Sequence, residues 1–257
     1  MSLSLYFDEY ACTHPDQKQG LPLVLLHGWG LHSVVWDPVM PALLQHYDVM
    51  VIDLPGMGRS PLPGGDYTLD FLVDQVLAVA PQRALWMGWS LGGMVAARIA
   101  ARFPERVGAL VTVATNPRFV ADDGWPHGVP EAVLTHFRSL FAEDWQGTII
   151  RFLALQCKDG VTMKDDTRFL KDIVFHHGLP ATKALRCGLE ILQAVDLRED
   201  YQCLSMPVMH VLGEKDNLVP CAVQGELQRL QPLAHVVVMK GVAHIPFVSS
   251  PAAFLTL

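Results

Sequence analysis

The segment Gly88-Trp89-Ser90-Leu91-Gly92 places a serine between two glycines, directly before an alanine-rich run with helical periodicity. Two interpretations are open. A serine at a helix start is often an N-cap, which accepts a hydrogen bond from the first turn. Alternatively, flanking glycines leave room for a tight strand-to-helix turn that presents the hydroxyl as a nucleophile. The second interpretation is favoured because a strand-like apolar segment precedes the motif.

A nucleophilic serine needs a general base, and the base needs a carboxylate that orients it. On a strand–turn–helix scaffold, the acid and then the base follow the serine in the chain, each after a later strand. Asp216 follows one such apolar segment, and His244 follows the next. Glu214 is the alternative carboxylate, two residues earlier. Among the eleven histidines, His244 has both the position and the order that this chemistry requires.

Acyl transfer to a serine also needs two donors for the negative charge that develops on the carbonyl oxygen. One expected donor is the N–H of Leu91, the residue after the nucleophile. The other is the N–H of Trp29, in the segment HGWG that follows an earlier strand. His27 and Asp53 are expected to have structural roles in turns. No metal-binding spacing and no phosphate-binding loop is present, and we expect no cofactor because such a site needs none.

The order of apolar segments predicts how these residues are positioned. Short, nearly continuous apolar runs alternate with helical patterns, which is typical of an α/β fold with a mostly parallel sheet flanked by helices. The alternation stops between 116 and 200, where we expect an all-helical cap inserted into a core formed by 1–115 and 201–257. Strands are expected at 21–28, 47–56, 83–90, 107–115, 206–216 and 234–241, and core helices at 69–80, 91–103, around 220–230 and from Pro251.

Composition narrows the possible partners. The chain is 51% hydrophobic with a net charge of −7, which argues against nucleic acid because phosphate binding needs clustered basic residues. No apolar run is long enough for a membrane span, and no secretory signal is evident, so we expect a cytoplasmic protein. The sequence does not determine the oligomeric state, and a monomer is favoured. An odd number of widely spaced cysteines fits free thiols in a reducing compartment. These are Cys12, Cys157, Cys187, Cys203 and Cys221.

Together, HGWG, DLPGMGRS, GWSLGG, Asp216 and His244 resemble the α/β-hydrolase superfamily. More specifically, the sequence resembles the biotin-synthesis carboxylesterases that hydrolyse the methyl ester of pimeloyl-[acyl-carrier protein]. The matching segments are 25–36, 88–96, 151–156 and 188–198. The last two fall within the expected cap, which diverges fastest among these hydrolases.

The resemblance implies that Ser90, Asp216 and His244 form a catalytic triad. It also implies an acyl-binding site beneath the cap. Without the resemblance, Phe152, Leu153 and Leu155 are expected to be cap core. The implied substrate-binding residues are Trp29, Ser90, Leu91, Phe152, Leu153, Ala154, Leu155, Gln156 and His244.

Family members contact their acidic carrier protein through basic cap residues, and Arg151, Lys164 and Arg168 stand at matching positions. Lys164 and Arg168 share one face of an expected helix with Lys171. A solvated helix face is the alternative interpretation. One basic position of the family falls at Gly147, and the insertion has more acidic than basic residues.

We therefore expect a serine carboxylesterase that cleaves this methyl ester through an acyl-enzyme. A broad short-chain carboxylesterase and a carbon–carbon bond hydrolase would use the same triad, and carrier-bound or small esters are the expected substrates. A ligand receptor with the same fold usually lacks triad members, so the complete set counts against a receptor.

Overall fold

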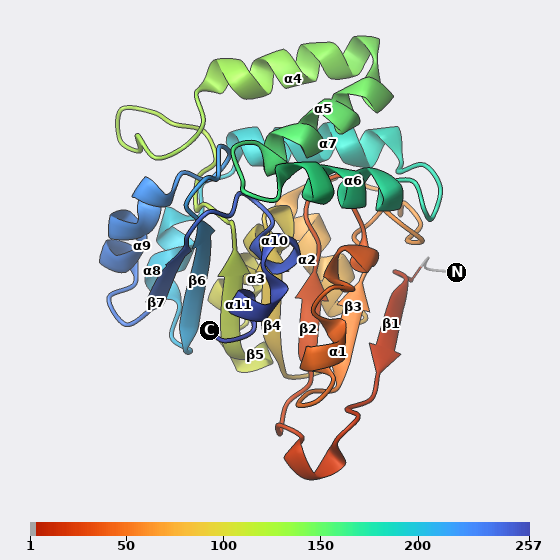
Figure 1. Cartoon of the computed structure of the whole chain (residues 1–257), viewed down its shortest axis with the longest axis vertical. Coiled ribbons are helices and arrows are strands. Elements are labelled where there is room, and N and C mark those ends of the chain that lie inside the picture. Colours follow the sequence, from red (N-terminus) through yellow and green to blue (C-terminus); the bar gives the residue numbers. More distant parts are fainter. Residues whose placement is uncertain (1–3) are drawn as a thin grey trace.

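A computed structural model describes residues 4–257 as a single sheet covered by helices (Figure 1). The strand order is β1-β3-β2-β4-β5-β6-β7. β1 runs antiparallel to β3, and the other neighbours are parallel, so the predicted fold class is confirmed. The strands are β1 Phe7–Tyr10, β2 Leu23–Leu26, β3 Val49–Ile52, β4 Ala84–Trp89, β5 Val107–Val113, β6 Val208–Gly213 and β7 His235–Met239.

The central strands are apolar because both faces of the sheet are covered. Every residue of β2 and β3 is buried, which explains why these segments lack the alternation of a half-exposed strand. In Figure 1, α2 and α3 lie behind the sheet, and α1, α10 and α11 lie in front of it. The core helices are α1 Met40–Leu43, α2 Leu69–Leu77, α3 Leu91–Arg102, α8 Arg198–Cys203, α9 Gln224–Leu230, α10 Pro246–Ser249 and α11 Pro251–Phe254.

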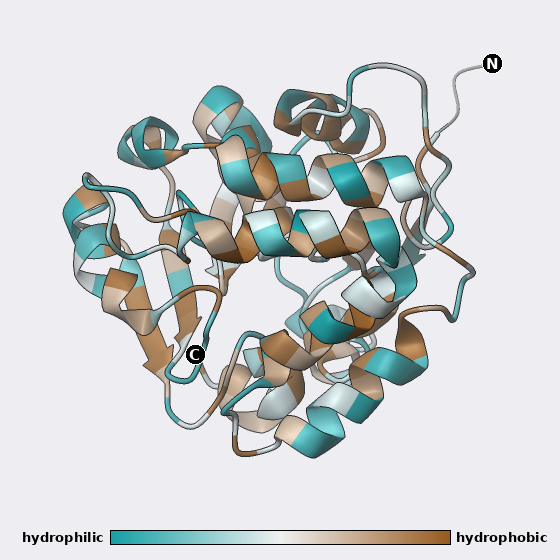
Figure 2. Ribbon diagram, turned by 90° about the horizontal axis from the view of Figure 1, so that it is seen from above, coloured by the Kyte–Doolittle hydropathy of each residue, from teal (hydrophilic) through white to brown (hydrophobic). Residues whose placement is uncertain are grey.

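Of the five helices between β5 and β6, the first four lie above the carboxyl ends of the strands (Figure 1). Viewed from above, these ribbons carry both hydrophilic and hydrophobic residues, as amphipathic helices do (Figure 2). We propose that they form the cap of residues 116–200. α8 begins at Arg198, inside that range, but packs against α3 and α9 of the core. The cap helices are α4 Glu131–Glu143, α5 Trp145–Cys157, α6 Met163–Ile173 and α7 Thr182–Ala194.

Shorter elements complete the description. The expected helix near 220–230 consists of a 3-10 turn followed by α9, and the helix from Pro251 is only one turn long. Of residues 4–257, no helix combines the length and apolar character needed to cross a membrane. The 3-10 helices are η1 Pro15–Gln17, η2 Ser33–Trp36, η3 Pro104–Arg106 and η4 Cys221–Val223.

We predict that Gly88→Ala destabilises the protein by about 1–3 kcal/mol through overpacking. A methyl group at Gly88 would lie only 2.6 Å from the Gly93 Cα and even closer to the Gly92 carbonyl. Gly225→Ala is the matched control, because a methyl group there meets nothing within 4 Å. Urea unfolding should show a lower midpoint for the first variant and no loss for the second. Equal midpoints would contradict the tight approach of β4 and α3.

Candidate active site

Ser90 occupies a strained turn between β4 and α3. Its φ angle is 54° and its ψ angle is −117°, a backbone conformation that residues other than glycine rarely adopt. Its side chain makes no hydrogen bond to the first turn of α3, although it stands at the N-cap position. Instead, the Ser90 Oγ lies 3.0 Å from the His244 Nε2. The structure therefore favours the nucleophile interpretation over the simple cap.

The His244 ring lies between Ser90 and a carboxylate. The Nδ1 of His244 is 2.7 Å from the Asp216 Oδ2. The other carboxylate oxygen, Oδ1, accepts hydrogen bonds from the N–H groups of Leu218 and Val219, at 2.8 and 2.9 Å. With the carboxylate ionised, Nδ1 is the donor to Asp216, and Nε2 is left to accept from the Ser90 hydroxyl. The arrangement can transfer a proton from Ser90 to His244.

Burial isolates these three side chains from water. Ser90 is 4% exposed, Asp216 6% and His244 0%. In such a low-dielectric setting, hydrogen bonds that involve a charge are stronger than in water. Glu214, the alternative carboxylate, lies elsewhere, and its Oε2 accepts from the N–H of Gly241 at 3.0 Å.

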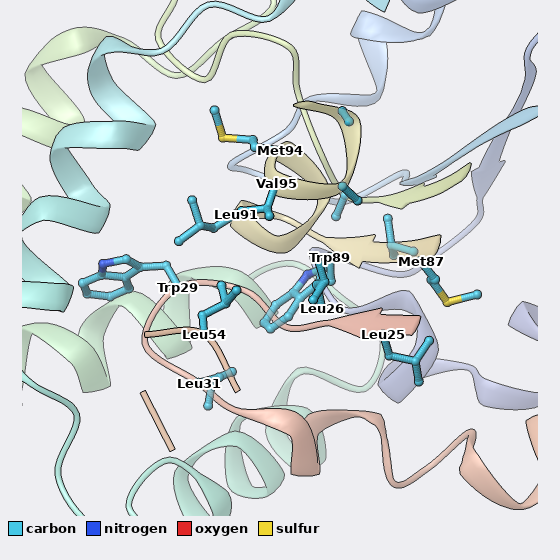
Figure 3. Close-up of a cluster of buried hydrophobic side chains, with 14 of the residues drawn as sticks. Leu25, Leu26, Trp29, Leu31, Leu54, Met87, Trp89, Leu91, Met94 and Val95 are labelled. Atoms are coloured by element: carbon cyan, nitrogen blue, oxygen red, sulfur yellow. The ribbon is translucent and has the colours of Figure 1, made fainter. Parts of the chain in front are cut away.

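The two expected oxyanion donors are free to bind a ligand. Within residues 4–257, the N–H groups of Trp29 and Leu91 have no hydrogen-bond acceptor. Both side chains border the same spot under α7, since a methyl group at Gly188 would lie 2.6 Å from the Trp29 Cδ1 and 3.8 Å from the Leu91 Cδ2. Figure 3 shows both residues in the buried apolar cluster around the turn.

His27 and Asp53 hold the loops that follow β2 and β3, as the sequence indicates. The Nε2 of His27 accepts from the N–H of Leu54 at 2.8 Å, so its Nδ1–H donates to the Gly28 carbonyl at 2.8 Å. Burial lowers the pKa of His27 and favours this neutral form. The Asp53 carboxylate accepts from the N–H of Ser33 at 2.7 Å. All these partners are within the protein, in keeping with structural roles.

Helix α5 brings part of the expected substrate-binding set to the site. Phe152 packs edge-on against Trp29 with ring centroids 4.8 Å apart. Gln156 is buried, and its carbonyl accepts a hydrogen bond from the His244 N–H at 3.0 Å. Leu153 is fully buried and Leu155 is half-buried. Ala154 is exposed, two positions after Phe152 and so on the other side of α5.

The basic residues expected to contact a carrier protein lie on exposed helix faces. Arg151 on α5 has Asp144 within 3.8 Å, and Arg168 on α6 has Asp165 within 3.9 Å. Ion pairs that are this exposed to solvent interact only weakly. Lys164 is exposed on the same face of α6 as Arg168, and the opposite face buries Leu170 and Ile173. Across residues 4–257, no group of three or more His, Cys, Asp or Glu side chains is arranged to hold a metal ion.

The model of the α/β hydrolase fold family matches residues 22–251. The chain belongs to this family. An α/β-hydrolase from Klebsiella pneumoniae is 46% identical over 232 residues, covering 90% of each chain, and one from Aeromonas salmonicida is 43% identical, covering 93% of this chain and 94% of that one. Both are named pimeloyl-[acyl-carrier protein] methyl ester esterase.

Solved structures of other α/β-hydrolases share the fold at low identity. The enol-lactonase from Burkholderia xenovorans LB400 is 22% identical with a TM-score of 0.83, covering 98% of this chain and 94% of that one. An esterase from Exiguobacterium antarcticum is 17% identical with a TM-score of 0.84, covering 98% and 92%. At this identity, the likeness concerns the fold alone.

A buried histidine links the loop after Trp29 to the cap. The Nε2–H of His32 donates to the carbonyl of Ile173, the last residue of α6, at 2.7 Å. Desolvation by burial lowers the pKa of His32 to about 4. The His177 ring packs against it, with ring centroids 4.7 Å apart. Nothing in the sequence pattern identified this link, because its two ends are 141 residues apart.

We predict that His32 contributes to a loss of stability as the pH is lowered. The pKa of His32 is about 4 in the folded chain against 6.5 for a free histidine, so the unfolded state binds more protons between these values. The free energy of unfolding should therefore decrease as pH falls from 6.5 to about 4. In His32→Asn this decrease should be shallower, measured by urea unfolding at a series of pH values. His14→Asn, at an exposed histidine, is the control, and identical slopes for both variants would contradict the assignment.

Proposed function

We propose that this chain is a serine carboxylesterase that hydrolyses the methyl ester of a pimeloyl group attached to acyl carrier protein. The observation that carries the proposal is the 46% identity, over 90% of both chains, to a relative named for this activity. The hydrogen-bonded line of Ser90, His244 and Asp216 supplies the chemistry that such an activity requires.

The first half of the reaction forms an acyl-enzyme. His244 Nε2 takes the hydroxyl proton as Ser90 Oγ attacks the ester carbonyl, and Asp216 stabilises the imidazolium that results. The N–H groups of Leu91 and Trp29 bind the negatively charged oxygen of the tetrahedral intermediate. One such donor is typically worth about 10²–10³ in rate. The C–O bond then breaks, and His244 passes its proton to the departing methoxy group, which leaves as methanol.

The second half releases the acid. His244 takes a proton from a water molecule, the resulting hydroxide attacks the acyl-enzyme carbonyl, and the Ser90 Oγ leaves with the proton returned by His244. The product is a free carboxylate at the distal end of the pimeloyl chain. We place this step in biotin synthesis and in the cytoplasm, and the five unpaired cysteines of the structure support a reducing compartment.

We propose that apolar cap side chains beside the triad bind the aliphatic chain of the substrate. The apolar side chains of Phe152 and Leu153 on α5 are buried, and the Phe152 ring packs on the ring of Trp29. The main-chain N–H of Trp29 is a proposed oxyanion donor. A methylene chain gains free energy by replacing water along such surfaces, at about 0.8 kcal/mol per buried methylene. We propose that Gln156 and Leu155 border the same chain.

We predict that the wild-type protein cleaves methyl pimeloyl-carrier protein and that Ser90→Ala loses this activity by a factor on the order of 10⁴–10⁶. The assay measures methanol release, alongside free short-chain methyl esters as competing substrates. Cleavage of the free esters without the carrier-bound ester would overturn the biotin assignment and favour a broad carboxylesterase. Undiminished activity in Ser90→Ala would overturn the nucleophile.

We predict that replacing Arg151, Lys164 and Arg168 together with Glu raises KM for the carrier-bound ester about tenfold or more. The KM for a free methyl ester should not change. Acidic carrier helices would be attracted to these exposed cations, and the effect should diminish at high salt. Arg83→Glu is the control. Arg83 is exposed and directly precedes β4, so it lies at the end of the sheet that is farther from the cap. An equal KM for the triple variant and this control would contradict the contact.

A further inference from the structure

Both main-chain polar groups of His244 are bound by residues from other parts of the fold. The His244 N–H donates to the Gln156 carbonyl at 3.0 Å. Its carbonyl accepts from the indole Nε1–H of Trp89 at 2.8 Å. Gln156 belongs to the cap helix α5, and Trp89 is the last residue of β4. The backbone of His244 is therefore held from the cap and from the sheet at once.

The Trp89 side chain is itself held in place by tight packing. Its side chain is 0% exposed, and a methyl group at Gly28 would lie 2.8 Å from its ring. The ring also packs edge-on against Phe247, with centroids 5.6 Å apart, and lies 5.7 Å from the His244 ring. Figure 3 shows the indole within the buried cluster around the turn. The position of its N–H is thus set by packing on several sides.

The hydrogen bond joins the base, His244, to the residue next to the nucleophile. Trp89 immediately precedes Ser90, so its backbone and that of the nucleophile move together. Its indole N–H then sets the distance from this turn to the backbone of His244. Within residues 4–257, no other group donates to the His244 carbonyl. A displacement of about 1 Å at a reacting group can lower the rate by on the order of 10²-fold.

We propose that Trp89 is a positioning residue of the triad, whose indole N–H aligns His244 with Ser90 by holding the His244 carbonyl. The proposal rests on the proposed function only in taking Ser90 as the nucleophile and His244 as its base. It assigns to the variable residue of G-x-S-x-G a role that the motif itself does not state.

Trp36 provides a matched comparison within the same cluster. It is also 0% exposed, and its ring stacks on Phe247 with centroids 4.2 Å apart. Its indole Nε1, however, has no hydrogen-bond partner in the described part of the chain. Replacing either tryptophan with phenylalanine removes the same atoms from a fully buried position beside Phe247. Only the change at position 89 also removes a hydrogen bond to the base.

The test compares Trp89→Phe with Trp36→Phe in the hydrolysis of a p-nitrophenyl ester of a short acyl chain. We expect Trp89→Phe to lower kcat about tenfold with KM unchanged, because alignment and not binding is lost. We expect less than about a twofold change in kcat for Trp36→Phe. The loss in thermal stability should be larger for Trp89→Phe, because that change leaves the buried His244 carbonyl without its donor. Proton NMR provides a second readout, the downfield resonance of the His244 Nδ1–H, which should broaden or shift only in Trp89→Phe.

Equal kcat values for the two variants, or a loss confined to KM, would overturn the proposal. If Trp89→Phe fails to fold, site-specific incorporation of benzothienylalanine at position 89 keeps the ring volume and removes the N–H. Full activity of that protein would also overturn the proposal. The wild-type enzyme must hydrolyse the p-nitrophenyl ester for this comparison, whereas the proposed function depends on the carrier-bound methyl ester, so either can fail without the other.

Discussion

The hydrogen bond between Ser90 Oγ and His244 Nε2 constrains the rest of the structure. It joins residues 154 positions apart, and Ser90 makes it from a backbone conformation with a φ angle of 54°. That conformation typically costs on the order of 1–3 kcal/mol and persists only where the surroundings determine it. Here β4 fixes one side of the turn and α3 the other, and the close approach at Gly88 leaves no space for a side chain. The sheet and its glycines thus serve to hold one hydroxyl in place.

Burial strengthens the hydrogen bonds of the triad, but it also restricts the access of a substrate to Ser90. Asp216 is 6% exposed, yet each of its carboxylate oxygens accepts a hydrogen bond, so its charge is compensated. The same burial leaves Ser90 only 4% exposed. An ester tethered to a carrier protein therefore cannot reach the nucleophile unless side chains or helices of the cap move aside. The cap is also the part of the molecule that carries the exposed cations Arg151, Lys164 and Arg168, so the surface proposed for docking belongs to the element that must move.

The sequence identified the polar residues that lie together at the candidate site better than it identified the elements around them. Ser90, Asp216 and His244 were identifiable because motif, chain order and strand ends are local signals. β1 was missed because its four residues are half-buried or exposed, so its pattern does not resemble the buried strands. Ala154 was grouped with its neighbours by resemblance, but two positions after Phe152 on a helix the side chain faces away from the site. The Trp89 bond to His244 joins residues 155 positions apart and had no sequence signal.

The contact between Gln156 and His244 gives the cap a direct influence on the base. A helix leaves its last carbonyls without intrahelical partners, and Gln156 lies one residue before the end of α5. The His244 N–H satisfies this carbonyl, so the end of the cap helix and the base share one hydrogen bond. Any cap movement that shifts the last turn of α5 must either break this bond or displace His244. Trp89 opposes that displacement from the sheet side, through its bond to the carbonyl of the same residue. The position of the base is therefore tied to the last turn of α5 on one side and to β4 on the other.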